Sequence, residues 1–418
     1  EHTISLQRRV TFMQFLQFFL WGAWLITVGA YAFNVLHLKG AEIGAIYGAM
    51  GIVSLFMPAL IGIIADKWIN KERVYALLHL GGALTLFGVS QTTDHQQVFW
   101  LMFLNSMCYM PTIPLGYTIA YSVLERNKLD NVKQFPKIRV WGTVGFILAM
   151  WLVSFLHLEL SQLQFKIAAT AQLLLGLYAF SLPKCPPEPQ LSNKSWSSRF
   201  GLDALALFKQ PQMAIFFIFS ALLGMALQMS NTWSDPFLHS FDQNPLYAGT
   251  FAVNYPGVLF SLSNISETVF ILAIPFFLRN YGIKKVMILS MCAWVLRFGL
   301  FALGNPGDGV FYLIISMLVY GCAFDFFNLS GSLFVEMNAP QHIRASAQGL
   351  FMMMVNGVGA FFGGISSGWL IDHQTVNDIT NWHTIWLICA VIALLMALSF
   401  GLIFKYKHDP RLTDRFTH

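Results

Sequence analysis

Two acidic residues stand in the middle of long apolar stretches, where a charge is costly. Glu267 lies in FSLSNISETVFILAIPFF, and Asp325 lies in VYGCAFDFFNLSGSLFVE. A charge at the centre of a membrane-spanning helix costs on the order of 2.5–3.5 kcal/mol, so residues that remain there usually serve a function. A carboxyl group in an apolar, partly dry setting favours its protonated form. Both residues are therefore candidates for binding and releasing protons, and a structural hydrogen-bond network is the alternative role for Glu267.

Amide side chains follow a similar spacing in two of these apolar stretches. Gln228 and Asn231 lie three residues apart in MALQMSNTW, and Asn264 lies three residues before Glu267. Residues three apart share one face of a helix. Amides donate and accept hydrogen bonds together, which matches hydroxyl groups or the edge of a nucleobase. Hydrogen bonding between helices is the alternative for Gln228 and Asn231.

Aromatic residues surround Asp325 at helical spacing. Tyr320, Phe324 and Phe327 would present an aromatic wall beside the acid. A plain aromatic core stripe is the competing interpretation, and it fits Phe327 better than Tyr320.

One arginine stands at the start of another apolar stretch, KIRVWGTVGF. Arg139, Thr143 and Phe146 follow spacings of four and three, so they share one helix face. The fixed fork of donors on a guanidinium group suits a hydroxylated ligand or a carboxylate. A simple anchor at the cytoplasmic membrane surface is the alternative role for Arg139.

Several other polar residues lie within apolar stretches. Arg297 and His79 are isolated in the sequence, and both are interpreted as structural because nothing nearby assembles a site with them. One stripe of the first stretch carries Gln14, Gln17, Trp21 and Trp24. Some of these side chains are expected to line a pathway, and an anchor at the membrane interface is the alternative for the tryptophans.

The composition shows which elements must position these residues. The 418 residues are 56% hydrophobic and 11% charged, against about 25% charged in an ordinary soluble domain. A bilayer core of roughly 30 Å needs about 20 apolar residues per helix. The sequence therefore predicts an all-α integral membrane protein with twelve spans, near residues 11–35, 41–66, 73–92, 97–123, 139–158, 163–182, 211–233, 252–278, 284–303, 309–335, 344–371 and 383–404.

The basic residues indicate the orientation of these helices. The net charge is +5, and the Lys and Arg residues gather in alternate short loops, as the positive-inside rule requires. Only Lys39 and Lys166 fall on the opposite side. This pattern predicts that both termini of an inner-membrane protein are cytoplasmic, and it explains the positive charge without a nucleic-acid partner.

The longest polar connection divides the chain at its midpoint. Six predicted spans lie on each side of it, which is the organisation of major facilitator transporters. The predicted domains are an N-terminal six-helix half at 1–182, a cytoplasmic linker at 183–210, a C-terminal six-helix half at 211–405 and a cytoplasmic tail at 406–418.

The sequence lacks the patterns of common cofactor enzymes. It contains no GxxxxGK[ST] or GxGxxG motif. Its five cysteines are scattered singly, without metal-ligand spacing. We therefore expect no metal site, no cofactor and no catalytic residues, and we interpret the protein as a transporter rather than an enzyme.

The whole chain resembles the bacterial nucleoside:proton symporters, the nucleoside permease and xanthosine permease type of the major facilitator superfamily. The resemblance is carried by FLQFFLWGAWLITVGAY at 15–31, MPALIGIIADKW at 57–68, FPKIRVWGTVGFILAMW at 135–151, ISETVFILAIPFFLRNYGIKKVM at 265–287 and VYGCAFDFFNLSGSLFVE at 319–336.

This resemblance implies proton-coupled nucleoside uptake by alternating access, with a small set of binding positions. The family's binding positions carry over to Arg139, Thr143, Phe146, Gln228, Asn231, Glu267, Tyr320, Phe324 and Asp325. The family commonly has Gln three residues before the glutamate of the eighth helix, where this chain has Asn264. The shorter amide loses about one methylene of reach, which bears on base preference or affinity rather than on the class of substrate.

The leading hypothesis is therefore a nucleoside:proton symporter that functions as a monomer. Asp325 is the first choice for the proton carrier, and Glu267 is the second choice, with a role in gripping ligand hydroxyls. Two alternatives are a proton-coupled carrier of another hydroxylated solute such as a sugar, and a membrane sensor that binds a nucleoside without moving it.

Overall fold

The computed structural model describes residues 2–188 and 195–407, and it divides into two compact units. Unit 1 comprises Glu1–Leu38 and Ile52–Ser195, and unit 2 comprises Lys39–Gly51 and Trp196–His418. The linker predicted at 183–210 is described only in part, and the predicted tail at 406–418 lies almost entirely outside the described residues. The predicted domain boundaries stay a prediction.

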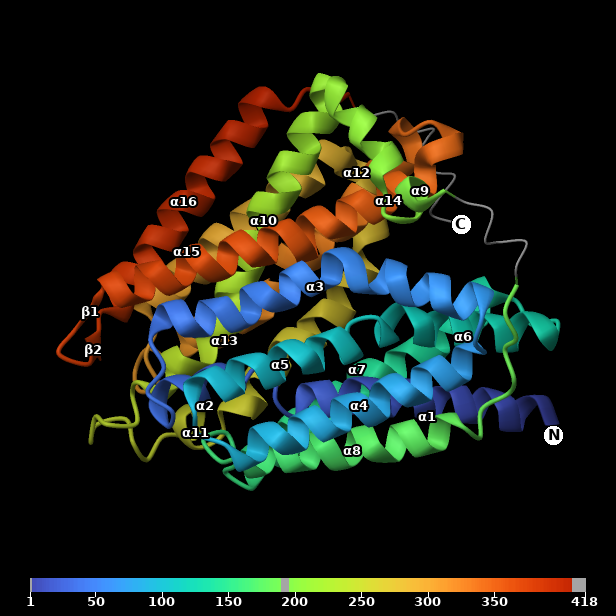
Figure 1. Cartoon of the computed structure of the whole chain (residues 1–418). Coiled ribbons are helices and arrows are strands. Elements are labelled where there is room, and N and C mark those ends of the chain that lie inside the picture. Colours follow the sequence, from blue (N-terminus) through green and yellow to red (C-terminus); the bar gives the residue numbers. More distant parts are fainter. Residues whose placement is uncertain (1, 189–194, 408–418) are drawn as a thin grey trace. The chain divides into compact units, whose positions relative to one another are not determined.

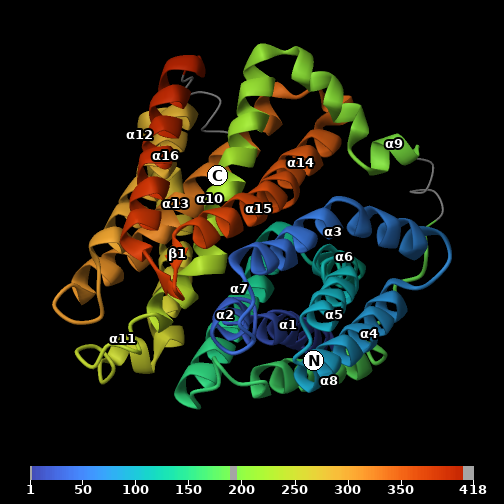
Figure 2. The same ribbon diagram turned by 60° about the vertical axis from the view of Figure 1, so that its left-hand side comes forward.

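Unit 1 is a bundle of helices in which α1 packs beside α7 and α4 packs beside α8 (Figure 1, Figure 2). Its helices are α1 (His2–Gly22), α2 (Val28–Asn34), α4 (Lys71–Gln91), α5 (His95–Tyr109), α6 (Thr112–Arg126), α7 (Asn131–Phe155) and α8 (Leu163–Ala179), together with the second part of α3 (Gly40–Lys67).

Unit 2 is a second bundle, in which α12 packs along α13 and α16, and α10 packs along α15 (Figure 2). Its long helices are α10 (Pro211–His239), α12 (Pro256–Leu303), α13 (Val310–Asn338), α15 (Gly359–His373) and α16 (Trp382–Ile403). Its short elements are α9 (Trp196–Arg199), η2 (Leu202–Lys209), α11 (Phe251–Asn254), η3 (Gln341–Ile343), α14 (Arg344–Met353) and η4 (Met354–Val358).

The helices account for the predicted membrane spans. Within the described residues, nine helices or helix pairs are long and apolar enough to cross a membrane. One of them, α12, contains both the eighth and the ninth predicted span, because its 48 residues are interrupted at Gly282, where φ is 81° and the backbone is not helical. The first predicted span falls on α1 and α2 together. The sixth falls on α8, which is 17 residues long.

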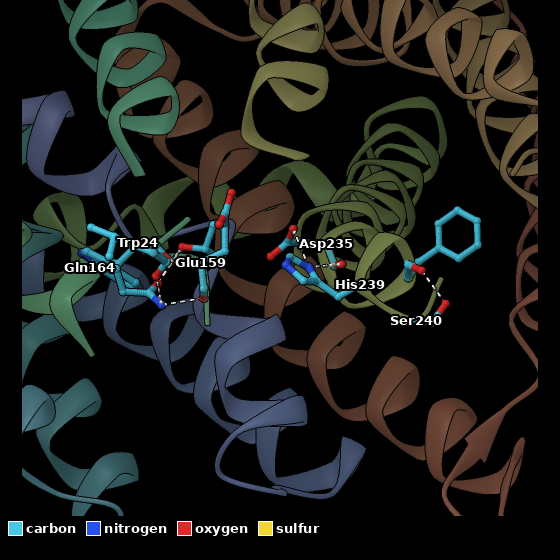
Figure 3. Close-up of polar contacts among 9 residues, drawn as sticks. Trp24, Glu159, Gln164, Asp235, His239 and Ser240 are labelled. Carbon is cyan, nitrogen blue, oxygen red and sulfur yellow. Dashed lines mark hydrogen bonds and ion pairs between the residues drawn. The ribbon is translucent and has the colours of Figure 1, made fainter. Parts of the chain in front are cut away.

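The first predicted span is not a continuous helix. Residues 23–27 form turns between α1 and α2. The Thr27 hydroxyl donates to Oε1 of Gln164 at 2.6 Å, and Nε2 of Gln164 donates to the Glu159 carbonyl at 2.7 Å (Figure 3). Gln164 therefore joins Thr27, in the turns between α1 and α2, to the segment just before α8 through buried hydrogen bonds.

A small hairpin departs from the all-helical prediction. Strands β1 (Thr375–Val376) and β2 (Ile379–Thr380) pair antiparallel across a two-residue turn. Asn377 and Asp378 form this turn with φ of 51° and 62°. Two central residues with positive φ are typical of the tight turns that join antiparallel strands.

Glycine allows α3 and α15 to approach each other closely within unit 2. A Cβ atom on Gly44 would lie 2.1 Å from the Gly364 carbonyl oxygen, so no larger residue fits at this crossing. Asp372, near the end of α15, accepts hydrogen bonds from the backbone N–H groups of Gly40 at 2.6 Å and Ala41 at 2.8 Å. This carboxylate satisfies donors that the first turn of a helix otherwise leaves unpaired.

Candidate functional site

The α7 group of predicted residues lies on one face of that helix. The Arg139 guanidinium donates through Nε to the Tyr117 hydroxyl at 2.8 Å and through an NH group to the Thr143 hydroxyl at 3.5 Å. Its central carbon lies 4.2 Å from the ring centroid of Phe18. Arg139 is half-buried, so its charge is held between an aromatic face and two hydroxyl groups rather than extended into water.

Phe146 continues this face toward α1. Its ring meets the Trp21 ring edge-on, with centroids 6.3 Å apart. The two helices approach closely because a Cβ on Gly22 would lie 2.6 Å from the Phe146 carbonyl oxygen. Arg139, Thr143 and Phe146 thus form one polar and aromatic group in unit 1, and the other predicted site residues all lie in unit 2.

In unit 2, a close contact between α12 and α13 positions the acidic and aromatic residues. The Ser266 hydroxyl donates to the Leu318 carbonyl and accepts from the Gly321 N–H, the latter at 3.1 Å. A Cβ on Gly321 would lie 2.5 Å from Ser266 backbone atoms. Ser266 precedes Glu267 and Gly321 follows Tyr320, so this contact brings the chain segments of the two predicted site residues together.

Asp325 is the more deeply buried of the two acids. Its side chain is 3% exposed, and its Oδ2 atom accepts no hydrogen bond from the part of the chain that the structure describes. Glu267 is half-buried and lies within electrostatic reach of both Asp325 and Tyr320. A buried carboxylate oxygen without a donor carries a high desolvation cost when it is ionised.

The aromatic residues divide between the site and the core. Tyr320 and Phe324 are half-buried, and their rings stack with centroids 5.7 Å apart and planes 5° apart. Phe327 is 2% exposed and packs on Phe216 and Phe351. The core interpretation therefore holds for Phe327, whereas Tyr320 and Phe324 form a flat, partly exposed surface next to Asp325.

The predicted amides lie on α10 and α12. Gln228 donates through Nε2 to the Thr232 hydroxyl at 2.7 Å, one turn further along α10. Asn231 and Asn264 are half-buried. The Gln228 contact lies within one helix, so it differs from the hydrogen bond between helices that was the alternative for this residue.

Arg297 is isolated in the sequence, but in the fold it contacts residues from distant segments. It is 3% exposed, and it donates through Nε to the Ser230 hydroxyl at 2.9 Å and through an NH group to the Ser316 carbonyl at 2.8 Å. Its central carbon lies 4.9 Å from the Tyr320 ring centroid. Because Ser230 precedes Asn231, this arginine links α12 to the segments that carry two candidate binding residues.

His79 also contacts residues from distant segments in the fold. Its Nε2 lies 2.8 Å from Oε1 of Gln17, which also accepts from the Tyr75 hydroxyl at 2.5 Å. Nε2 of Gln17 donates to the Thr112 hydroxyl at 2.9 Å. Gln17 is 1% exposed and is held in this network, so it connects α1, α4 and α6 of unit 1 instead of lining an open pathway.

One buried acid was missed by the sequence reasoning because it lies beyond the predicted end of its span. Asp235 is fully buried, and one carboxylate oxygen lies 3.2 Å from Nδ1 of His239, one turn along α10 (Figure 3). The spacing of four between the acid and the histidine was the available signal. Within the described residues, no three His, Cys, Asp or Glu side chains gather in a way that would hold a metal ion.

Comparison with known proteins covers nearly the whole chain. The profile of the family described as Nucleoside H+ symporter matches residues 4–409. The chain is 53% identical to xanthosine permease of Escherichia coli (strain K12) over 97% of this chain and 98% of that protein. It is 51% identical to nucleoside permease NupG of the same organism, over 99% of this chain and all of NupG.

A solved structure gives the same result for the fold. The crystal structure of the nucleoside transporter NupG covers 96% of this chain and all of its own, with a TM-score of 0.91, and a mutant form of NupG gives 0.94. At 51% identity, the likeness extends to the sequence as well as the fold. The predicted major facilitator fold is confirmed.

Proposed function

The chain belongs to the nucleoside H+ symporter family, and from that premise we propose how its residues couple nucleoside binding to proton movement. The protein is a multi-pass membrane transporter, not an enzyme, and its function is proton-coupled nucleoside symport. The residues that perform each step, the orientation and the oligomeric state are the subject of the proposal.

The nucleoside base packs on the stacked rings of Tyr320 and Phe324, and on Phe146. A stacked aromatic pair presents a flat, rigid face, and contacts between a base and an aromatic side chain typically contribute about 1–3 kcal/mol. The planes of Tyr320 and Phe324 are only 5° apart, which supports a role as one continuous surface.

Polar groups of the ribose and the base bind to amide, hydroxyl and guanidinium groups. Gln228, Asn231 and Asn264 supply paired donors and acceptors. Arg139 and Thr143 supply donors that are already oriented by their contact with each other. Glu267 accepts hydrogen bonds from ligand hydroxyls, which suits a half-buried carboxylate that remains reachable.

Asp325 carries the proton. The observation that supports this role is its buried Oδ2 atom, which lacks a donor in the described part of the chain, beside the aromatic surface and within electrostatic reach of Glu267. An ionised carboxylate in that position lacks the hydrogen bonds that burial requires, and a proton on the group removes this cost. Nucleoside binding next to Asp325 therefore favours loading of the proton at the same step.

We further propose that the protein functions as a monomer in a bacterial inner membrane, with both termini in the cytoplasm. Alternating access of the two halves then exposes the site to each side in turn. The distribution of Lys and Arg in the loops supports this orientation.

Proteoliposome uptake tests the assignment of the proton carrier. Wild-type protein should accumulate radiolabelled uridine, adenosine or xanthosine when an inward proton gradient is imposed, and an uncoupler should abolish that accumulation. Asp325→Asn should fail to accumulate nucleoside above equilibrium while it still exchanges labelled for unlabelled nucleoside across the membrane.

Asp308→Asn is the matched control, because Asp308 is an exposed acid in the connection before α13. It should behave as wild type. Gradient-dependent accumulation by Asp325→Asn would show that another group carries the proton. Failure of the wild-type protein to accumulate any nucleoside, when it is folded, would overturn the proposed substrate itself.

A further inference from the structure

A cavity of about 660 Å³ opens at the beginning of α1, between that helix and α7. It lies entirely within unit 1. Its lining consists of Ile4, Gln7, Arg8, Thr11, Phe12 and Phe15 from α1, and Gln134, Lys137, Ile138 and Trp141 from α7. Two of these residues are basic, two carry amides and none is acidic.

The two basic residues of this cavity carry unbalanced charge. Arg8 and Lys137 are both exposed, and within residues 2–188 and 195–407 neither side chain forms an ion pair. Arg8 also borders a second cavity of about 530 Å³ on the other side of α1, which is lined by Ile4, Ser5, Arg9 and Tyr178. The local field at this end of α1 therefore favours an anion.

The lining changes from charged to aromatic along the helices. Phe15 lies seven residues beyond Arg8, which is about 10 Å along a helix, and Trp141 lies one turn beyond Lys137. Phe12 is 47% exposed and Trp141 is 48% exposed, so both present apolar surface at the cavity. A ligand that fits this gradient has an anionic end and an apolar tail.

The cavity is separate from the proposed nucleoside site. Lys137 and Trp141 are four residues apart and share a face of α7, whereas Arg139 and Thr143 share the other face. The exposed Trp141 side chain contrasts with the half-buried Arg139. The nucleoside and the ligand of this cavity therefore contact opposite sides of one helix.

We propose that this cavity binds an anionic phospholipid, with its phosphate between Arg8 and Lys137 and its acyl chain along Phe12 and Trp141. Basic pockets between membrane helices at the cytoplasmic surface attract anionic headgroups, and each Lys or Arg contributes about 1 kcal/mol there. Under the proposed topology, the lipid comes from the cytoplasmic leaflet. The aromatic part of the cavity distinguishes a lipid from a free phosphate ion, which has no tail to place there.

Native mass spectrometry of the purified full-length protein in detergent tests this proposal. The probes are palmitoyl-oleoyl phosphatidylglycerol, which is anionic, and palmitoyl-oleoyl phosphatidylcholine, which has no net charge. Wild-type protein should retain the anionic lipid preferentially. The double variant Arg8→Gln with Lys137→Gln should bind it about thirtyfold more weakly, with binding of phosphatidylcholine unchanged.

The matched control is Arg73→Gln with Lys184→Gln, which removes the same charge from exposed residues of unit 1 outside the cavity. It should bind phosphatidylglycerol as wild type does. Trp141→Ala should weaken both lipids about fivefold, because the tail contact is lost while the headgroup contact remains.

Three results would overturn the proposal. The first is equal retention of the two lipids by the wild-type protein. The second is an equal loss of phosphatidylglycerol in the control double variant, which would indicate a general effect of surface charge. The third is complete displacement of the lipid by inorganic phosphate in the millimolar range, which would indicate a site for free anions. Nucleoside exchange by each variant in phosphatidylcholine vesicles verifies that the protein is folded.

Discussion

Arg139 in unit 1 and Asp325 in unit 2 are both enclosed, but their polar atoms are satisfied to different degrees. The guanidinium of Arg139 already has hydroxyl partners on Tyr117 and Thr143 and an aromatic face on Phe18. The Oδ2 atom of Asp325 is buried without a donor in the described part of the chain.

This difference follows from what each group is proposed to do. Arg139 is proposed to bind the ligand through its planar fork of donors, so it needs partners that hold this fork in position. A group that exchanges a proton must be stable in both forms, and a fixed donor would favour the ionised form alone. We infer that α7 supplies orientation and that α13 supplies the proton equilibrium.

The largest effect should come from Arg139→Ala, which tests the binding role of unit 1. Loss of a charged hydrogen-bond donor costs about 1.5–3 kcal/mol, so nucleoside affinity should fall roughly tenfold to hundredfold. Arg139→Lys should recover little of this loss, because an ammonium group lacks the planar fork. Isothermal titration calorimetry measures this loss of nucleoside affinity, and Arg73→Ala, at an exposed residue, is the control.

The pH dependence of transport sharpens the same comparison. The pH dependence of exchange should be unchanged in Arg139→Ala, because the proton is assigned to Asp325 and not to Arg139. In Asp325→Asn the pH dependence of exchange should be lost, because the proposed proton carrier is absent. A pH profile altered in the first variant and retained in the second would reverse the proposed division of roles.

The next effect concerns Arg297, which braces α10 and α13 within unit 2. Arg297→Met leaves the Ser230 hydroxyl and the Ser316 carbonyl without their partner. An unsatisfied buried group costs about 1–3 kcal/mol. The thermal midpoint of unfolding should fall, and KM for nucleoside should rise because Tyr320 loses its cationic neighbour. An unchanged KM in folded Arg297→Met would show that this arginine contributes to stability and not to nucleoside binding.

A smaller effect is expected at the aromatic surface. Tyr320→Ala removes one ring of the stacked pair and should raise KM about tenfold, as expected from the usual energy of a contact between a base and an aromatic ring. Tyr320→Phe keeps the ring and should change KM much less. Equal losses in both variants would show that the hydroxyl group, rather than the stacking surface, binds the substrate.

The smallest effect should come from Asn264→Gln, which adds one methylene of reach. A single methylene in a binding pocket changes relative affinity by about tenfold or more only when it is well packed, and Asn264 is half-buried. The ratio of purine to pyrimidine nucleoside uptake should therefore shift by less than about tenfold, while total uptake is retained. A change confined to total uptake would contradict a role in base preference.

Sequence reasoning could locate the membrane helices, because the cost of exposing polar groups to lipid acts on each segment separately. It could also select Glu267 and Asp325, because an acid inside an apolar stretch is visible without any knowledge of packing. The family followed from motifs spread along the whole chain, and the comparisons confirmed it. The roles of the individual site residues stay predictions.

The same reasoning failed where side chains from distant segments meet. Arg297 and His79 looked isolated because their partners lie 19 to 67 residues away in the chain. In the interruption between α1 and α2, Thr27 forms a hydrogen bond with Gln164, which is 137 residues away in the chain. Asp235 was missed because hydropathy alone ended its helix too early.

The sequence by itself thus determined that this protein is a helical membrane protein, since the apolar length of each segment acts locally. The transport of nucleosides followed from the resemblance of the whole chain to a known family. Only the tertiary structure decided which polar groups are satisfied. It pairs Arg297 with Ser230 and Ser316, places Gln17 in a closed network, and leaves an oxygen of Asp325 without a donor in the described part of the chain. Hydrogen-bond satisfaction depends on atoms brought together by packing, and sequence spacing does not encode those distances.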